Sequence, residues 1–254
     1  DLLCDAELVE RRFGSLRIVA RGQEDFEALR DALLGGGETL KQSKKGRVWR
    51  VGDWVVKERT VGAAVQTLRR AHYRLPWLAA HHLCRHGVGT PEPVAYAETG
   101  HLGIVGRSML VTRYLEGYRD VEHFLVALVQ RGAGPDTLAA FLQGIACAVN
   151  ALTASGAVHH DLSGKNIFTA DGTRFVFLDL EAVTLGTPYD DNARLRNHVQ
   201  LYDSFCDHLN DTMLVPFILR MLGDAADPRV WMPRVRKEQA ARRRRIHAKW
   251  DKQG

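Results

Sequence analysis

The chain has 254 residues, of which 45% are hydrophobic and 26% charged, an ordinary composition for a globular protein. This length leaves room for two lobes but little for further domains. The four cysteines form no C-x-x-C pair, which argues against a disulfide framework or a zinc site and favours a reducing compartment. No stretch approaches the roughly 20 apolar residues that span a bilayer, and no signal-peptide pattern opens the chain.

Positive charge is concentrated near the C-terminus. Ten Lys/Arg and two acidic residues between positions 229 and 254 give this segment a charge of +8, so the remainder carries −3 of the net +5. Trp231, Val235, Ile246 and Trp250 are interspersed among the basic residues. A charge so localised predicts an anionic partner for this basic tail, and a solvated helix with a few packing contacts is the competing interpretation.

The N-terminal part alternates between short strand patterns and two helical patterns. Gly35 to Gly37 end the first helical pattern, and Gly52-Asp53 form the turn of a hairpin. Together these patterns predict a small sheet with one prominent helix. The expected strands are 15–20, 46–51, 54–57, 94–98 and 108–114, with an extended segment at 90–93, and the expected helices are 24–34 and 61–86, the latter interrupted by Pro76.

After Gly117 the chain becomes mostly helical. The pattern over 137–155 places apolar residues on one stripe, as expected for a buried helix face, and Gly156 ends it. Two short β-type runs follow, separated by a polar loop. The expected helices are 120–131, 137–155, 194–209 and 215–222, and the expected β-type runs are 157–158 and 175–178.

The polar loop reads HHDLSGKNI over residues 159–167 and matches the H-x-D-L-x-x-x-N pattern of a kinase catalytic loop. Phosphoryl transfer requires a carboxylate that orients and deprotonates the attacking hydroxyl. It also requires oxygen ligands that hold Mg²⁺ against the phosphates. An Asp and an Asn five residues apart on one tight loop can serve both needs, and the apolar strand 175–178 delivers a further carboxylate, Asp179. A solvated turn between two strands is the alternative explanation of this loop.

These residues receive distinct predicted roles. Asp161 is the predicted catalytic base, and Asn166 and Asp179 are the predicted Mg²⁺ ligands. His159 belongs to the catalytic set as the residue that braces the loop, and Lys165 as one that reaches the transferred phosphate.

Nucleotide-binding residues are predicted in the N-terminal part. Lys57 ends the strand pattern 54–57 and would lie over the α- and β-phosphates of ATP. The segment 43–47 would cover the phosphates through Lys45 and Gly46, although it has one glycine where kinases have three. A surface lysine at a strand end is the ordinary alternative for Lys57.

Two departures from the protein-kinase pattern stand out. No acidic residue occurs between Arg59 and Pro91, where a helix glutamate usually pairs with the strand lysine. The candidate substitutes are Gln66, Glu24 and Glu27, unless Lys57 acts unpaired. Asp179 is followed by Leu-Glu and no A-P-E follows, which argues against control through an activation loop.

Taken together, these segments resemble the bacterial lipopolysaccharide kinases, which phosphorylate Kdo or heptose in the inner core. The resemblance spans roughly residues 45 to 210 and does not choose between the two sugars. It rests on Lys57, the segment 87–94 (GVGTPEPV), the segment 111–117 (VTRYLEG), the loop 159–166, the segment 178–181 (LDLE) and the helical pattern 194–205.

The resemblance implies a fold, cofactors and partners. The expected fold is α+β and bilobal, with an N-terminal nucleotide-binding lobe (1–116), a C-terminal catalytic lobe (117–228) and the basic tail (229–254). ATP and Mg²⁺ are the expected cofactors, and a lipid-linked sugar is the expected acceptor. The tail would hold the enzyme on the inner face of the bacterial inner membrane, in the cytoplasm. No nucleic-acid module accompanies the tail, so no nucleic-acid partner is expected.

Two other functions fit the same motifs. One is a soluble small-molecule kinase of the aminoglycoside or choline phosphotransferase type, which shares the catalytic loop but needs no basic tail. The other is a pseudokinase that binds nucleotide without turnover. The missing helix glutamate favours a pseudokinase, whereas the presence of Asp161, Asn166 and Asp179 argues against one.

Overall fold

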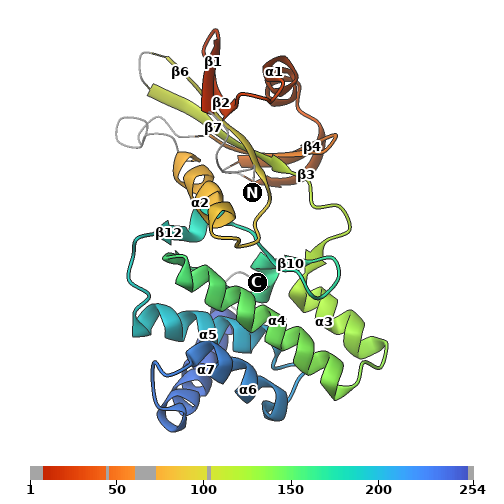
Figure 1. Cartoon of the computed structure of the whole chain (residues 1–254), viewed down its shortest axis with the longest axis vertical. Helices are drawn as coiled ribbons and strands as arrows, with labels where there is room; N and C mark the ends of the chain where they lie inside the picture. The colour runs from red at the N-terminus through yellow and green to blue at the C-terminus, as the bar shows by residue number, and fades with distance from the viewer. Residues whose placement is uncertain (1–7, 44–45, 61–72, 102–103, 251–254) are drawn as a thin grey trace. The chain divides into compact units, whose positions relative to one another are not determined.

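A computed structural model describes residues 8–43, 46–60, 73–101 and 104–250 of the chain. The chain divides into two compact units, Asp1–Glu116 and Gly117–Gly254. The elements of each unit are labelled in Figure 1.

The first unit is built on one antiparallel sheet with the strand order β1-β2-β6-β7-β5-β4-β3. Strands β1 and β3 were not predicted from the sequence. Both lie at sheet edges, and every residue of β3 is exposed, so the sequence shows no apolar alternation there. The strands are β1 (Leu8–Phe13), β2 (Leu16–Arg21), β3 (Glu38–Ser43), β4 (Gly46–Val51), β5 (Trp54–Thr60), β6 (Pro93–His101) and β7 (Ile104–Arg113).

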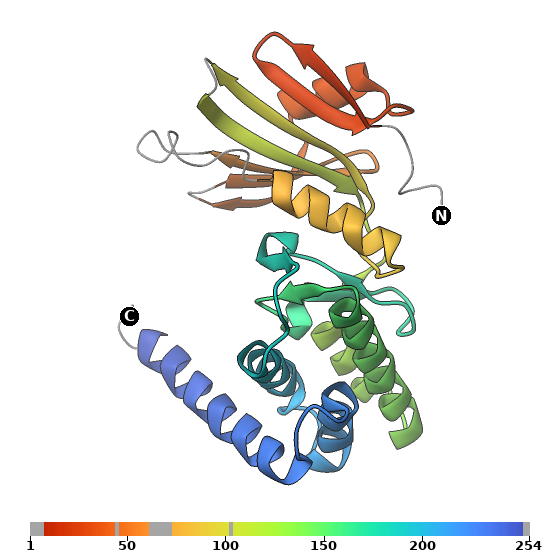
Figure 2. The same cartoon turned by 60° about the vertical axis from the view of Figure 1, so that its left-hand side comes forward.

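Helices α1 (Phe26–Gly35) and α2 (Arg74–Arg85) pack on opposite faces of this sheet. Asp25 caps α1 by accepting hydrogen bonds from the N–H groups of Glu27 and Ala28. The α1 face contains the main core, where the Trp49 indole donates to the carbonyl of Ala32 over 3.2 Å. The α2 face has a smaller core, in which Trp77 and Tyr73 pack with residues of β6 and β7. The two helices are seen with the sheet in Figure 2.

Pro76 lies in the first turn of α2, where a backbone N–H has no partner within the helix. The predicted interruption at Pro76 is therefore wrong for the described helix, which runs on from Arg74 to Arg85 without a break. The remainder of the predicted helix, residues 61–72, lies outside the described residues.

Helices dominate the second unit, as the sequence predicts. Three short strands, β8 (Arg119–Asp120), β10 (Ile167–Thr169) and β11 (Val176–Phe177), form one small sheet, and β9 (Ala157–His159) pairs with β12 (Val183–Leu185) in another. The predicted runs 157–158 and 175–178 therefore belong to different sheets. The helices are α3 (Val121–Gln130), α4 (Pro135–Ala154), α5 (Asp191–Phe205), α6 (Asp211–Leu222) and α7 (Pro228–Trp250).

Helix α4 is central to this unit. By length and composition it is long and apolar enough to cross a membrane, and no other helix in the described ranges is. It nevertheless packs on α6 and buries a stripe of its apolar residues. Helix α4 is therefore a core helix of the second unit. Its buried residues are Phe141, Leu142, Ile145, Ala146, Val149 and Leu152.

The basic segment 229–254 is not an extended tail over its described part. Helix α7 belongs to the second unit and packs against α5. Trp231, Met232 and Val235 are buried, and the indole of Trp231 donates to Nδ1 of His198 on α5 over 2.9 Å. Of the two interpretations of the segment, the structure supports packing for Trp231, because its ring is not available to a membrane. The side chain of Trp250 lies outside the described part.

Part of the charge on α7 is compensated within the unit. Arg242 and Arg243 pair with Asp203 of α5, Arg243 also pairs with Asp207, and Arg236 pairs with Asp211. The positive segment and the acidic remainder of the chain are thus partly complementary surfaces of one folded unit.

Removing the Trp231 side chain should destabilise the protein strongly. We expect Trp231→Ala to lower the free energy of unfolding by about 3 to 5 kcal/mol, because it leaves a cavity between α5 and α7. The neighbouring Val230 is 68% exposed, so Val230→Ala should change the same quantity by less than about 0.5 kcal/mol. Urea unfolding of both variants tests this, and similar small losses in both would contradict the packing of α7.

Candidate active site

Short backbone pairings hold the catalytic loop at both ends. His160 N–H, just after β9, donates to the carbonyl of Ala182 over 2.7 Å, and Leu178 N–H donates to the carbonyl of Asn166 over 2.8 Å. The second bond pairs Leu178 with Asn166, and Asp179 is the next residue after Leu178. Asn166 and Asp179, predicted as ligands of one metal, are therefore neighbours in the fold.

His159 is a buried brace, as expected from its position. Its Nε2 lies 2.9 Å from the carbonyl of Leu178, and its Nδ1 lies 3.2 Å from the N–H of Asp161. Nδ1 must accept from that N–H, so Nε2 carries the proton and donates to Leu178. Burial lowers the pKa of His159, which favours this neutral form. One ring thus ties the residue before Asp179 to the backbone of Asp161.

Two amide side chains orient Asp161. Asn166 donates through Nδ2 to the Asp161 carbonyl over 2.8 Å and lies 3.4 Å from Oδ2 of its carboxylate. Gln200, on α5, donates through Nε2 to Oδ1 of Asp161 over 2.7 Å. The carboxylate is thereby held by both its oxygen atoms while the residue remains exposed to an incoming hydroxyl.

Helix α5 also holds the backbone of the loop. Gln200 accepts from the N–H of Leu162 over 3.0 Å, and the hydroxyl of Ser204 accepts from the N–H of Gly164 over 2.9 Å. Gly164 is required here, because a Cβ at this position would lie 2.6 Å from Cγ of Glu122 on α3 and 3.2 Å from Cβ of Ser204. Sequence reasoning recognised the helical pattern 194–205 but gave no role to Gln200 and Ser204, which lie about forty residues after the loop residues they contact.

Asp179 adopts a left-handed backbone conformation with φ 55° and ψ 50°, and no other non-glycine residue of the described ranges has positive φ. Such a conformation costs on the order of 1 kcal/mol and is often retained at functional sites.

Because Asn166 uses its NH₂ group on Asp161, its Oδ1 is left as an acceptor. Asn166 and Asp179 thus provide hard oxygen donors that fit Mg²⁺, which usually takes few protein ligands and completes its shell with phosphates and water. No group of three or more His, Cys, Asp or Glu able to hold a metal occurs in the described ranges.

Lys165 is exposed on the short helical turn Gly164–Asn166. The part of the chain that the structure describes offers it no hydrogen-bond or ion-pair partner. Its ammonium group is therefore available to an anion near the catalytic loop.

In the first unit, Lys57 lies on β5 between Val48 of β4 and Leu110 of β7. Val56 is part of the α1-side core and side chains alternate along a strand, so Lys57 lies on the face that carries α2. Gly46 opens β4, where a Cβ would lie 2.1 Å from the carbonyl oxygen of Glu58, so close packing of the strands alone requires a glycine. Lys45 lies outside the described residues.

The described candidates for a partner of Lys57 are engaged elsewhere. Glu24 is buried and pairs with Arg21 over 3.0 Å and with Arg113 over 3.6 Å, and Glu27 pairs with Arg30. The suggestion that either glutamate orients Lys57 is therefore wrong in this conformation. Gln66 lies outside the described residues.

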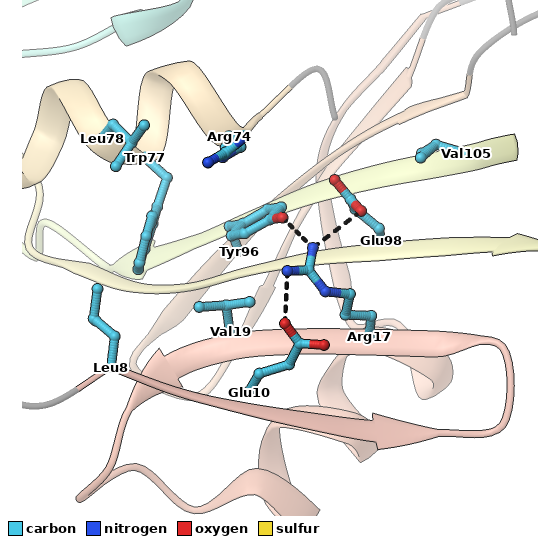
Figure 3. Close-up of a pocket in the computed structure, with 10 residues that line it drawn as sticks. All are labelled: Leu8, Glu10, Arg17, Val19, Arg74, Trp77, Leu78, Tyr96, Glu98 and Val105. Carbon is cyan, nitrogen blue, oxygen red and sulfur yellow. Dashed lines mark hydrogen bonds and ion pairs between the residues drawn. The ribbon is translucent and has the colours of Figure 1, made fainter. Parts of the chain in front are cut away.

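The first unit has a cavity of about 570 Å³ on the α2 side of the sheet, shown in Figure 3. Arg17 lies across it and pairs with Glu10 and Glu98, and it also donates to the Tyr96 hydroxyl. The hydrogen bond and charge of Glu10 raise the pKa of Arg17. Arg17 is thus engaged by the carboxylates of Glu10 and Glu98, while Oε1 of Glu98 is buried without a hydrogen-bond partner in the described ranges.

The family model of the lipopolysaccharide kinase (Kdo/WaaP) family matches residues 40–215, more than two thirds of the chain. A search of curated proteins gave no match.

Among solved structures, WaaP in complex with acyl carrier protein is 23% identical, with a TM-score of 0.64, and the match covers 87% of this chain and 93% of that one. WbdD matches at a TM-score of 0.49 and 14% identity, covering 80% of this chain and 50% of the other. Glucosamine kinase, solved with glucosamine, ADP and phosphate, matches at 0.46 and 18%, covering 95% and 70%. The likeness to WaaP confirms the predicted α+β, protein-kinase-like fold.

Gln200 offers a test of how Asp161 is positioned. Gln200→Glu keeps an acceptor for the N–H of Leu162 but replaces the donor to Asp161 by a second carboxylate, whereas Gln200→Leu removes both contacts. We expect both variants to lower kcat about tenfold or more, because a misplaced catalytic group is costly, and to leave the affinity for nucleotide nearly unchanged. Steady-state kinetics and nucleotide titration measure these quantities. Wild-type kcat in Gln200→Glu would show that the contact to Asp161 has no catalytic role.

Proposed function

Because the chain belongs to the lipopolysaccharide kinase (Kdo/WaaP) family, we propose that it transfers the terminal phosphoryl group of ATP to a hydroxyl of a Kdo or heptose residue in the inner core of lipopolysaccharide. Family membership makes it a phosphotransferase with a sugar hydroxyl as acceptor. The observation that carries the proposal is the orientation of Asp161 by Asn166 and Gln200, inside the matched range.

In the proposed mechanism the acceptor hydroxyl approaches the exposed carboxylate of Asp161, which takes its proton as the oxygen attacks the γ-phosphorus of ATP. The bond between that phosphorus and the bridging oxygen breaks, and ADP leaves with the electron pair. Asn166 and Asp179 would hold Mg²⁺, which neutralises charge on the phosphates when it is bound. Lys57, with Lys45 and Gly46, is proposed to contact the phosphates of ATP. His159 keeps Leu178 and Asp161 in place without changing its own protonation.

The two other functions have less support. A soluble small-molecule kinase would share the loop, but the family match covers the loop, β5, the whole of α5 and the start of α6 together. A pseudokinase has no need of a carboxylate held at both oxygen atoms beside two metal-binding groups. Lys57 has no described partner, but this does not affect Asp161, which is still present as the proposed base for the sugar hydroxyl.

We also propose that the enzyme is a peripheral protein of the cytoplasmic membrane face, where a lipid-linked acceptor resides. The support is an exposed basic stripe on α7, formed by Arg234, Lys237, Arg244 and Arg245. Lys237 and Arg244 lie on the side of α7 opposite buried Val235, with Arg234 and Arg245 beside them, and each would contribute about 1 kcal/mol at an anionic surface. A protein is the alternative partner of this stripe, since WaaP was solved in complex with acyl carrier protein.

Asp161→Asn should abolish phosphoryl transfer. We expect kcat to fall by about 10² to 10⁴, the usual contribution of a general base, while nucleotide affinity stays nearly unchanged. The assay follows labelled phosphate from ATP to a deacylated inner-core glycan, with and without chelation of Mg²⁺. Asp224→Asn, at an exposed carboxylate outside the site, is the control and should behave as wild type. More than a tenth of wild-type turnover in Asp161→Asn would rule out its role as base.

The basic stripe should govern attachment to anionic membranes. We expect Lys237→Gln combined with Arg244→Gln and Arg245→Gln to weaken binding to phosphatidylglycerol vesicles by at least tenfold, and binding of the wild type to fall as salt rises. Vesicle sedimentation measures this, and the melting temperature should not change because the three side chains are exposed. Deleting α7 would be uninformative, since it would remove buried Trp231. Undiminished vesicle binding by the triple variant would exclude the stripe, and loss of binding to acyl carrier protein alone would favour the protein partner.

A further inference from the structure

A second cavity, of about 540 Å³, lies in the second unit beside the catalytic loop. Its volume is within the usual range for small-molecule sites. Four elements contribute to it: α3, the catalytic loop, the end of α5 and the C-terminal half of α7. Its lining includes Glu122, Ser163, Lys165, Asp203, Arg242 and Arg243.

Arg243 forms the fixed wall of the cavity. Its Nε donates to Asp203 over 2.6 Å, and its two Nη groups donate to the oxygens of Asp207 over 2.8 Å each. The hydrogen bonds to Asp207 and Asp203 raise the pKa of Arg243. All its donor groups are engaged, so Arg243 joins α7 to α5 and has little left for a ligand.

Arg242 is different, because only one of its five N–H groups has a partner within the described ranges, the carboxylate of Asp203. The side chain of Arg242 is 32% exposed, and its guanidinium keeps a forked set of donors. Lys165 lines the same cavity from the catalytic loop, also without a described partner. Two cations with unused donors thus border one cavity, one on α7 and one four residues after Asp161.

The cavity also has acceptors suited to hydroxyl groups. The side chains of Glu122 and Ser163 have no hydrogen-bond partner within the described ranges, and Glu122 is brought against the loop by the close approach at Gly164. A sugar acid or phosphorylated sugar presents hydroxyls together with an oxyanion, which this combination of a carboxylate, a hydroxyl and two cations can satisfy.

We propose that this cavity is the acceptor subsite, in which Arg242 and Lys165 bind a carboxylate or phosphate of the acceptor glycan while Glu122 accepts hydrogen bonds from its hydroxyls. The inference rests on the proposed function and adds to it the part of the acceptor that is recognised. The cavity borders the catalytic loop at Ser163 and Lys165, two and four residues after Asp161, so a glycan bound there would lie beside the loop that carries the proposed base.

The site faces away from the centre of the basic stripe. Arg242 is rotated around the helix by about 140° from Lys237 and by about 160° from Arg244, whereas Arg245 lies about 60° from Arg242 at the edge of the stripe. An oxyanion in the cavity could still come from a phospholipid headgroup, and a soluble acceptor separates this source from the glycan.

The test uses the full-length protein and two soluble probes: a deacylated inner-core glycan, and the same glycan with its carboxylates methylated and its phosphates removed. We expect Arg242→Gln to raise the KM for the anionic glycan at least tenfold and to leave kcat and the KM for ATP within about twofold. The same variant should show the wild-type KM for the neutral glycan. Arg220→Gln, at an exposed arginine of α6, is the matched control and should change none of these values.

Arg242→Lys preserves a cation beside Asp203 but loses the forked geometry, and it replaces Arg242→Gln if that variant melts early. Equal rises in KM for both glycans would overturn the proposal. An unchanged KM for the anionic glycan would also overturn it, and this is the result expected if the cavity binds a phospholipid headgroup. The proposed function fails in a different way, if wild type transfers phosphate to neither glycan. Calorimetric titration of the anionic glycan without ATP then still decides whether Arg242 binds it.

Discussion

The hydrogen bond between Gln200 and Asp161 is the contact on which the arrangement of the site depends. It joins the catalytic loop to α5, and the same side chain also accepts the N–H of Leu162. Without this contact the carboxylate on the seven-residue loop would sample several rotamers. Selecting the reactive one would then add to the activation free energy. Ser204, one turn further along α5, repeats the attachment at Gly164, so one helix sets the position of the whole loop.

Helix α7 extends this dependence to the C-terminus. It packs on α5 through Trp231 and through the pairing of Arg242 and Arg243 with Asp203. Helix α5 therefore contacts the catalytic loop through Gln200 and Ser204 and contacts α7 through Asp203 and His198. The two arginines are adjacent in sequence but differ in their hydrogen bonds. The guanidinium of Arg243 donates to the carboxylates of Asp203 and Asp207, whereas that of Arg242 donates only to Asp203.

Much of the fold was predictable because its local patterns are strong. The stripe on α4, the hairpin of β4 and β5 and the loop 159–167 were all placed correctly from spacing alone. The edge strands β1 and β3 were missed because exposed strands have no apolar alternation. Gln200 was missed because a single amide on a helix is indistinguishable from a solvated residue until the helix is packed against the loop.

The sequence by itself determined which residues are candidates for the chemistry of the loop, since Asp161, Asn166 and Asp179 are recognisable by residue type and spacing. It also determined where the positive charge lies along the chain. Only the tertiary structure decided what that charge contacts, because the carboxylates of Asp203, Asp207 and Asp211 come to α7 through packing of helices that are distant in sequence. For the same reason only the structure showed Glu24 paired with Arg21 rather than with Lys57. Spacing along a chain specifies neighbours on one element, whereas contacts between elements depend on how their buried faces pack.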